Sequence, residues 1–267
     1  MKFFLPVCLA CFCCAGCSGI STNFNTATDQ QETTTYSTDR EVQIGASVAQ
    51  EVEKEFKVVD DVATNERVDR ITQKIAAVCD RKEITYIGKV IEPKKPTGEK
   101  MVNAMSLPGG YVYVFKDLLE YIKDDHELAA VIAHEVGHVT ARHSIKHLQA
   151  SYGSFVSILA AFANPQLAGG MFMAFETMML QYSQEDELEA DALGFKYMKA
   201  AGYDTQGMVR MLEALQAYDR KQPIRQKAYG RTHPYIHQRI ANVDKLIHQG
   251  DISYRDWVKM TGEEQHP

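Results

Sequence analysis

Two histidines and a glutamate lie in the pattern His-Glu-x-x-His, at His134, Glu135 and His138. Residues four apart differ by about 40° around a helix, so the two imidazoles share one face and can bind one ion. Glu135 lies about 100° from His134, where a general base for an activated water is expected. A pair of core or solvated histidines is the alternative, but imidazoles in an apolar helix are costly without a partner. The pattern therefore indicates a metal-dependent hydrolase.

A zinc site of this kind needs a third protein ligand and one open position. The extension His-x-x-Gly-x-x-His is absent, because Ala141 and Ser144 hold its positions. In the next dense acidic cluster, Glu187 and Asp191 lie four apart and share a helical face. We expect Glu187 to be the third ligand and Asp191 to orient a ligand histidine from behind. The other acids of this cluster are explained as a solvated helix start, favoured by the macrodipole: Glu185, Asp186 and Glu189.

Two further histidines, His143 and His147, also lie four residues apart. On a continued helix, His143 lies about 180° around the axis from His134, because it follows nine residues later. The pair therefore cannot join the same ion, and we expect it on the surface; a second metal site is the alternative. No spacing argument applies to three other histidines: His126, His237 and His248.

Helices must position the motif. Asp124 can cap the helix of the motif, with Glu127 in the third helical position, and the apolar run at 128–139 continues it. An earlier helix is predicted to open at a capping box of Thr38 and Glu41 and to run to about residue 56. Apolar residues at helical spacing predict another helix at about 61–79: Val68, Ile71, Ile75 and Val78. Cys79 at its end fits a small buried hydrophobe better than a nucleophile.

A small β-sheet is expected between these helices. The β-branched run at 84–91 predicts a strand, followed by a polar loop at 93–100. Pro108-Gly109 favours a type II turn and 111–115 a strand, so we expect a hairpin or a turn that feeds an edge strand. Such an edge could pair with an extended peptide, but a plain sheet element explains these residues better.

In combination, residues 38–250 resemble peptidase family M48, the CAAX prenyl protease-like zinc endopeptidases and their soluble bacterial envelope relatives. The main match is His-Glu-x-x-His at 134–138 followed by Glu-x-x-Ala-Asp at 187–191. Weaker motifs support it: Asn-Ala…Leu-Pro-Gly-Gly at 103–110, Ala-Arg-His at 141–143, and Thr-His-Pro at 232–234 with Arg239.

The resemblance implies a zinc-dependent endopeptidase with one ion per chain. It assigns the zinc ligands to His134, His138 and Glu187, the general base to Glu135, and a supporting role behind the ligands to Asp191. The implied fold is α+β and predominantly helical, a zincin-like metalloprotease domain with a small β-sheet beside the H-E-x-x-H helix.

The resemblance also implies roles for two residues near the end of the chain and for one strand. It places His233 near the metal, either as the group that stabilises the oxyanion or as a fourth ligand in a latent state. It gives Arg239 a supporting role in the same region. It further implies that substrate backbone pairs with the strand that follows Gly110.

Residues 155–180 form the most apolar stretch beyond the N-terminal region. Asn164-Pro165 and Gly169-Gly170 interrupt it, so it predicts two short apolar helices and no spanning one. These helices could cover the core as a hairpin, rest on a membrane, or act as a lid over the zinc site. The resemblance is compatible with a lid.

Composition and charge exclude several classes of protein. The chain has 267 residues, 45% of them hydrophobic and 24% charged, which excludes a mainly disordered chain, a collagen and a multi-span membrane protein. Its net charge of -6 gives no overall electrostatic reason to bind nucleic acid, so we expect no nucleic-acid partner.

Five of the six cysteines lie within the first seventeen residues, beside a positive charge and a short apolar run. This pattern predicts a signal peptide. Ala15-Gly16-Cys17 resembles the end of a bacterial lipobox, which implies a lipoprotein signal peptide at 1–16 and lipidation of Cys17; cleavage at an ordinary small-residue site is the alternative. Ser18 would then be the second residue. It is not the aspartate that retains bacterial lipoproteins at the inner membrane, so the outer membrane is favoured. The polar residues up to 37 are interpreted as a flexible tether, and 38–267 as the metallopeptidase domain.

The combined reading is a zinc endopeptidase of the bacterial cell envelope, attached to the membrane by its N-terminal lipid. Its expected substrates are unfolded or extended polypeptides, and misfolded or misassembled envelope proteins are the natural source of these. Two alternatives stay open. One is a chaperone-like assembly factor for outer-membrane proteins that binds clients and rarely cleaves them. The other is a hydrolase of non-peptide amides in the cell wall.

Overall fold

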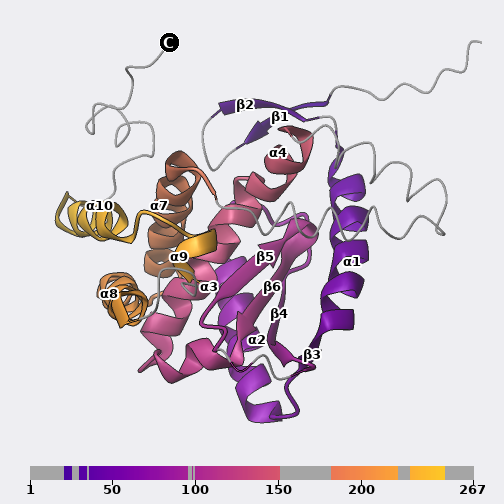
Figure 1. Ribbon diagram of the computed structural model, residues 1–267. Coiled ribbons are helices and arrows are strands. Elements are labelled where there is room, and N and C mark those ends of the chain that lie inside the picture. The colour runs from indigo at the N-terminus through magenta and orange to yellow at the C-terminus, as the bar shows by residue number, and fades with distance from the viewer. Residues whose placement is uncertain are drawn as a thin grey trace, which may run out of the picture.

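The computed structural model describes residues 21–25, 30–34, 36–95, 98, 100–150, 182–221 and 229–249. Most of these residues lie in helices, which surround a four-stranded sheet (Figure 1). The architecture is α+β and predominantly helical, with a small sheet beside the H-E-x-x-H helix, so the predicted fold class is confirmed. Among the described helices, none combines the length and the apolar character that crossing a membrane requires.

The sheet has the strand order β3-β4-β6-β5. Its strands are β3 (Phe56–Val58), β4 (Ile87–Pro93), β5 (Ala104–Leu107) and β6 (Tyr111–Phe115). β6 pairs in parallel with β4 and antiparallel with β5, and β3 pairs antiparallel with β4. Within the described residues β5 is therefore an edge of the sheet, and β6 is an inner strand.

A tight turn joins β5 to β6. Within the short 3-10 helix η1 (Pro108–Gly110), Gly109 has φ of 76°, the left-handed value that the third residue of a type II turn requires. The predicted hairpin is confirmed. The expectation that the strand after Gly110 offers its edge to substrate is wrong, because both edges of β6 are already hydrogen-bonded to other strands.

Helices cover both faces of the sheet: α1 (Thr38–Glu55), α2 (Val62–Ala76), α3 (Asp125–Thr140) and α4 (His143–Ala150). Successive residues of a strand point to opposite faces. Val112 and Val114 of β6 accordingly join the core formed with α2 and α3. Tyr113 and Phe115 join a second core, formed with α1 and α4. The H-E-x-x-H helix thus lies against one face of the sheet.

A second layer of helices packs on the other side of α3: α7 (Gln184–Ala200), α8 (Gln206–Lys221), α9 (Tyr229–Thr232) and α10 (Ile236–Gln249). Every residue of α3 from Glu127 to Thr140 is buried between the two layers (Figure 1). A Cβ atom on Gly137 would lie 2.7 Å from the carbonyl oxygen of Ala190, so only glycine permits this approach of α3 to α7. The close approach brings Glu187 beside the two motif histidines.

Helix α2 is confirmed, with Asp61 as its N-cap, and Cys79 just after it is buried as expected. β4 begins at Ile87, three residues later than the predicted strand. The β-branched composition extends beyond the hydrogen-bonded part of the segment, and composition alone does not set the end of a strand.

The predicted capping box of α1 is wrong by one residue. Ser37 is the N-cap, because its hydroxyl accepts the backbone N–H of Arg40 at 3.3 Å, and Thr38 is the first helical residue. Glu41 is buried and pairs with the Arg81 guanidinium at 2.8 Å, so it serves a long-range ion pair in place of the cap.

The segment interpreted as a tether contains two short strands, β1 (Ser21–Asn25) and β2 (Gln30–Thr34), which pair antiparallel. The expectation of an unstructured tether does not hold over these ten residues. Low hydrophobicity argues against a packed core, but a ladder of backbone hydrogen bonds does not need one, and threonine favours extended backbone. The predicted signal peptide, Cys17, and the apolar stretch at 155–180 lie outside the described residues.

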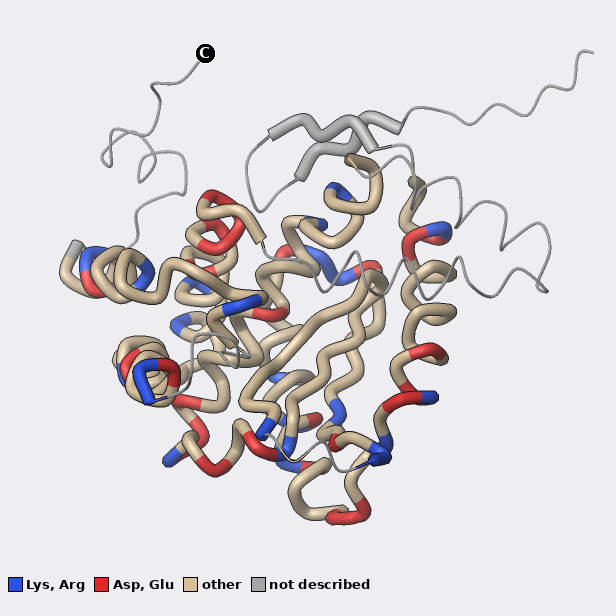
Figure 2. The backbone as a smooth tube through the Cα atoms, viewed as in Figure 1, with Lys and Arg blue, Asp and Glu red and all other residues tan. Residues whose placement is uncertain are grey.

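Charged positions lie mostly on the helices (Figure 2). In the sheet, β5 and β6 carry no charged residue, whereas β4 includes Lys89 and Glu92. Within the described ranges, two groups of arginine–carboxylate pairs are buried: Glu41 with Arg81 and Arg142, and Glu187 and Asp191 with Arg239. A buried charge is costly unless it is paired. The second group lies beside the motif histidines and defines the candidate site.

Candidate active site

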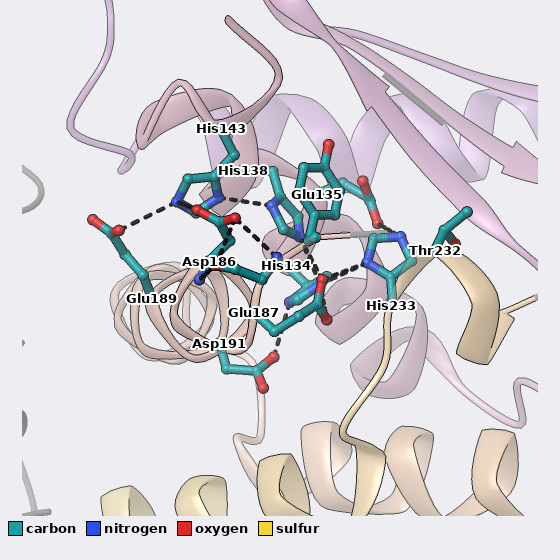
Figure 3. A network of polar contacts seen from close by, with 12 residues as sticks. His134, Glu135, His138, His143, Asp186, Glu187, Glu189, Asp191, Thr232 and His233 are labelled. Carbon is teal, nitrogen blue, oxygen red and sulfur yellow. Dashed lines mark hydrogen bonds and ion pairs between the residues drawn. The ribbon is translucent and has the colours of Figure 1, made fainter. Parts of the chain in front are cut away.

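Helix α3 points both motif histidines in one direction (Figure 3). The Nε2 atoms of His134 and His138 lie 3.0 Å apart, and both side chains are buried. Asp124 caps the helix by accepting two backbone N–H groups of its first turn. The one-turn spacing of the motif therefore brings the two imidazole nitrogens to a common point, as the sequence predicted.

Glu187 reaches the same point from α7. This helix begins with a capping box in which the Ser183 hydroxyl and the Asp186 carboxylate each accept from the other's backbone N–H. Glu187 follows directly, with its carboxylate 3.4 Å from Nε2 of His138 and 3.6 Å from Nε2 of His134. The local signal that starts α7 thus fixes the turn on which Glu187 stands.

His233, in the segment after α9, is the fourth member of the group. Its Nδ1 lies 3.0 Å from Oε1 of Glu187 and 3.3 Å from Nε2 of His134. One donor atom from each of the four residues, His138 included, lies within 4.8 Å of the others, and all four side chains are buried. Three imidazoles and one carboxylate form a donor set that zinc prefers.

Glu135 lies beside this group and is not part of it. Its side chain is 1% exposed, and neither carboxylate oxygen accepts a hydrogen bond from the described residues. The contact found for it is Nε2 of His233, 3.4 Å from Oε1. A buried carboxylate without a hydrogen-bond donor is costly, so this arrangement fits a site that receives a water or substrate proton there.

The charge states of two of the four donors, His138 and Glu187, also fit a metal. Burial lowers the pKa of His138 well below its ordinary value, which leaves the neutral imidazole that a metal requires. Burial alone would raise the pKa of Glu187, but the charges of Arg239 and His233 hold it well below its usual range. Burial would likewise lower the pKa of His233, yet the Glu187 and Glu135 carboxylates raise it.

Behind His134, Asp191 and Arg239 form a buried support. The Nδ1 atom of His134 lies 2.8 Å from Oδ1 of Asp191. Arg239, which is fully buried, donates from Nε and Nη2 to the two Asp191 oxygens, each at 2.8 Å. Its Nη1 lies 2.6 Å from Oε2 of Glu187. A single guanidinium therefore holds the carboxylates of both a candidate ligand and its neighbour.

Tyr229 connects Arg239 to His233. Its Nη1 donates to the hydroxyl of Tyr229 at 3.3 Å, and the Tyr229 ring stacks on the His233 ring with centroids 4.9 Å apart. The structure thus places Arg239 in direct contact with Glu187 and behind the His233 ring.

The expectation that His143 lies on the surface is wrong. Its side chain is fully buried, and its Nδ1 lies 2.8 Å from Nδ1 of His138. The helical extrapolation fails because α3 ends at Thr140 and Arg142 takes φ of 58°, so α4 starts in a new direction. His143 therefore returns to the site from which a continuous helix would have turned it away.

The interpretation of the acidic cluster as a solvated helix start is also wrong for two residues. Glu189 is 8% exposed, and its Oε2 lies 3.2 Å from Nε2 of His143. Asp186 lies 3.0 Å from Nε2 of His147 and 3.4 Å from His143, in addition to its role in the cap. The reason is the same turn, which brings α4 across the start of α7.

Two contacts of the site were not predicted from the sequence. The Tyr182 ring stacks on the His138 ring at a centroid distance of 3.9 Å, and its hydroxyl lies 3.0 Å from that of Ser144. Thr232 donates to the amide oxygen of Asn103 at 3.3 Å, which connects the start of β5 to the His233 segment. The motifs at 103–110 and 232–234 gave a signal for the second contact, but no spacing pointed to Tyr182.

The three histidines without a spacing argument lie away from these contacts. The ring of His126 accepts the backbone N–H of Asp204 at 3.1 Å, just before α8. His237 and His248 are exposed on α10. None of them belongs to the metal-compatible group found among the described residues.

Comparison with known proteins identifies the family. The model of peptidase family M48 matches residues 62–247, which include every residue of the site. The chain belongs to peptidase family M48. Its match includes the helix with the histidine motif, the Glu187 helix and the His233 segment, so this M48 domain carries the whole group.

Several characterised members of the family are similar in sequence. The chain is 29% identical over 187 residues to mitochondrial metalloendopeptidase OMA1 of Schizosaccharomyces pombe, covering 69% of this chain and 53% of that protein. It is 34% identical over 128 residues to the beta-barrel assembly-enhancing protease of Escherichia coli, covering 43% and 26%. It is 32% identical over 124 residues to metalloprotease YcaL of Escherichia coli, covering 44% and 48%. The chain thus spans about half or less of the length of these relatives.

Proposed function

We propose that this M48 protein is a zinc-dependent endopeptidase that cleaves unfolded or extended polypeptides. One observation carries the proposal: the buried, unbonded carboxylate of Glu135 lies next to four convergent metal donors. A structural histidine cluster would have no use for such a carboxylate. A hydrolase needs one as a proton acceptor.

The ligands in this proposal are His134, His138 and Glu187, which hold one ion per chain. Zinc at this position would polarise the scissile carbonyl and lower the pKa of a water molecule toward about 7. Glu135 then takes the proton of the attacking water and passes it to the leaving amine. Burial around Glu135 excludes competing water, which strengthens its interaction with the reacting groups.

His233 has two candidate roles, and its two ring nitrogens separate them. Nδ1 faces Glu187 and His134, as a fourth ligand of a latent enzyme would. Nε2 faces Glu135 and could donate to an oxyanion once the ring moves aside. A His233→Ala variant distinguishes them, because losing a latent ligand raises peptidase activity and losing an oxyanion donor lowers it.

The edge of β5 that pairs with no other strand among the described residues is the proposed site of substrate pairing. An extended peptide can add to a sheet edge through backbone hydrogen bonds, with little demand on its sequence. The Asn103–Thr232 contact connects the start of this strand to the His233 segment, and Nε2 of His233 lies 3.4 Å from Glu135. We therefore expect a peptide along β5 to pass close to the site. This geometry suits unfolded substrates, because folded proteins rarely present a free strand.

The proposed location is the bacterial cell envelope. The N-terminal sequence pattern supports a periplasm-facing lipoprotein, anchored through Cys17 and directed by Ser18 to the outer membrane. The name of one relative, the beta-barrel assembly-enhancing protease of Escherichia coli, supports misassembled outer-membrane proteins as substrates. The similar OMA1 protein is mitochondrial, so the location depends mainly on the N-terminal sequence.

That same relative's name favours one alternative, an assembly factor that binds clients and rarely cleaves them. The two functions separate in one experiment. Wild-type protein and the Glu135→Gln variant are incubated with unfolded casein and with an unfolded outer-membrane protein, and cleavage and binding are both measured. We expect cleavage by the wild type alone and binding by both. Equal cleavage by the two proteins would refute the role of Glu135, and binding without cleavage by either would favour the assembly factor.

A further inference from the structure

The buried His143 and the acidic Glu189 have no role in the chemistry described so far, yet they connect to the site. His138 turns Nε2 toward His134 and Glu187, and its Nδ1 toward Nδ1 of His143 at 2.8 Å. On the far side of the His143 ring, Nε2 lies 3.2 Å from Oε2 of Glu189. Figure 3 shows this chain leading away from the metal-compatible group.

The positions of the protons in this chain follow from elementary chemistry. A neutral imidazole carries one N–H, and a metal takes the nitrogen that lacks it. With Nε2 of His138 facing the metal position, its proton is on Nδ1, which donates to Nδ1 of His143. That nitrogen must then be the acceptor, so His143 carries its own proton on Nε2 and donates it to the Glu189 carboxylate.

Two acidic residues lie within reach of His143, and their contacts separate their roles. Glu189 makes the hydrogen bond at 3.2 Å, whereas Asp186 lies farther, at 3.4 Å. Asp186 is occupied otherwise, because it accepts from Ser183 in the cap and lies 3.0 Å from Nε2 of His147. Glu189 is therefore the acceptor that fixes the His143 tautomer.

We propose that His143 and Glu189 are positioning residues that orient His138 for zinc through the directional chain His138–His143–Glu189. Partners behind a metal ligand set the tautomer and the orientation of its ring, and their loss costs about 10–100-fold in metal affinity. This inference rests on the proposed zinc site, but it concerns residues that do not touch the ion.

Zinc affinity, measured by competition with a chelator in full-length protein, tests the chain. His143→Leu removes both bonds and should weaken zinc binding about 10–100-fold. His143→Asn is the rescue variant, because its amide oxygen lies at the position of the ring Nδ1 and can still accept from His138. His147→Gln is the matched control on the same helix, since His147 contacts Asp186 and not His138.

The expected order of zinc affinity is wild type equal to His147→Gln, His143→Asn within a few-fold, and His143→Leu far weaker. Nitrogen-15 spectra of the zinc-loaded wild type should also show His138 protonated at Nδ1 and His143 at Nε2, a result that does not depend on any variant folding. Equal affinity of His143→Leu and wild type, or the reverse tautomers, would overturn the chain. A wild type that binds no zinc would instead overturn the proposed function on which the chain depends.

Discussion

The two histidines of the motif are held from behind in different ways. His134 meets a carboxylate directly, and that carboxylate, Asp191, is locked by the buried Arg239. His138 meets a second imidazole, and only beyond His143 does the chain reach a carboxylate. One support is short and ionic, and the other is longer and passes through a neutral ring.

The difference teaches what each support can contribute. A hydrogen bond to a charged group is about twice as strong as one between neutral groups, so the Asp191 support fixes His134 more firmly. The same support is also part of the core, because Arg239, Asp191 and Glu187 neutralise one another in a buried cluster. The His143 support carries less of the fold. We therefore expect the first to affect stability and zinc together, and the second mainly zinc.

The largest effect is expected at Glu187, whose carboxylate lies close to both motif histidines. Glu187→Ala removes a proposed ligand and leaves Arg239 without one of its two carboxylates, so zinc binding should be lost. Glu189→Ala should keep zinc at saturating concentration. Metal content by mass spectrometry measures both, and zinc retained by Glu187→Ala but lost by Glu189→Ala would reverse the assignment.

The second prediction compares how much each support contributes to the free energy of unfolding. Asp191→Ala leaves a buried guanidinium with an incomplete partner set, which should lower the free energy of unfolding of the zinc-free protein by about 3 kcal/mol. Glu189→Ala removes an acceptor from a neutral ring and should cost about 1–2 kcal/mol. Urea unfolding of both zinc-free variants measures the difference. Equal losses would show that the two supports do not differ as described.

A smaller effect is expected from a change that touches neither support. Gly137→Ala places a methyl group 2.7 Å from the Ala190 carbonyl and must push α3 from α7. We expect a loss of about 1–3 kcal/mol in stability. Zinc affinity should fall as well, because Glu187 stands on α7 and the histidines on α3. Unchanged zinc affinity in a destabilised protein would show that the site tolerates this movement.

Part of the His134 side could be read from the sequence because the spacing within each helix is a local property. The spacing of His134 and His138 on α3, and of Glu187 and Asp191 on α7, determines which side chains share a face. The family resemblance supplied what spacing could not, namely that His233 and Arg239 return to this place from the end of the chain.

The His138 side could not be read in the same way. Its partner His143 follows a break in the helix at Arg142, whose positive φ no pattern in this sequence announces. Once the helix direction changes, angular extrapolation places His143 on the wrong side. The contact of His143 with the buried Glu189 is then not predicted either. The edge of the sheet was misplaced for a related reason, because strand order depends on long-range pairing that local composition does not encode.

Zinc anomalous scattering from crystals of the zinc-loaded protein tests the central claim most directly. The account predicts one peak per chain, about 2.0–2.2 Å from Nε2 of His134, Nε2 of His138 and a carboxylate oxygen of Glu187. Glu135 should lie beside the peak without binding it. A peak among His143, His147 and Asp186, or direct ligation by Glu135, would contradict the account.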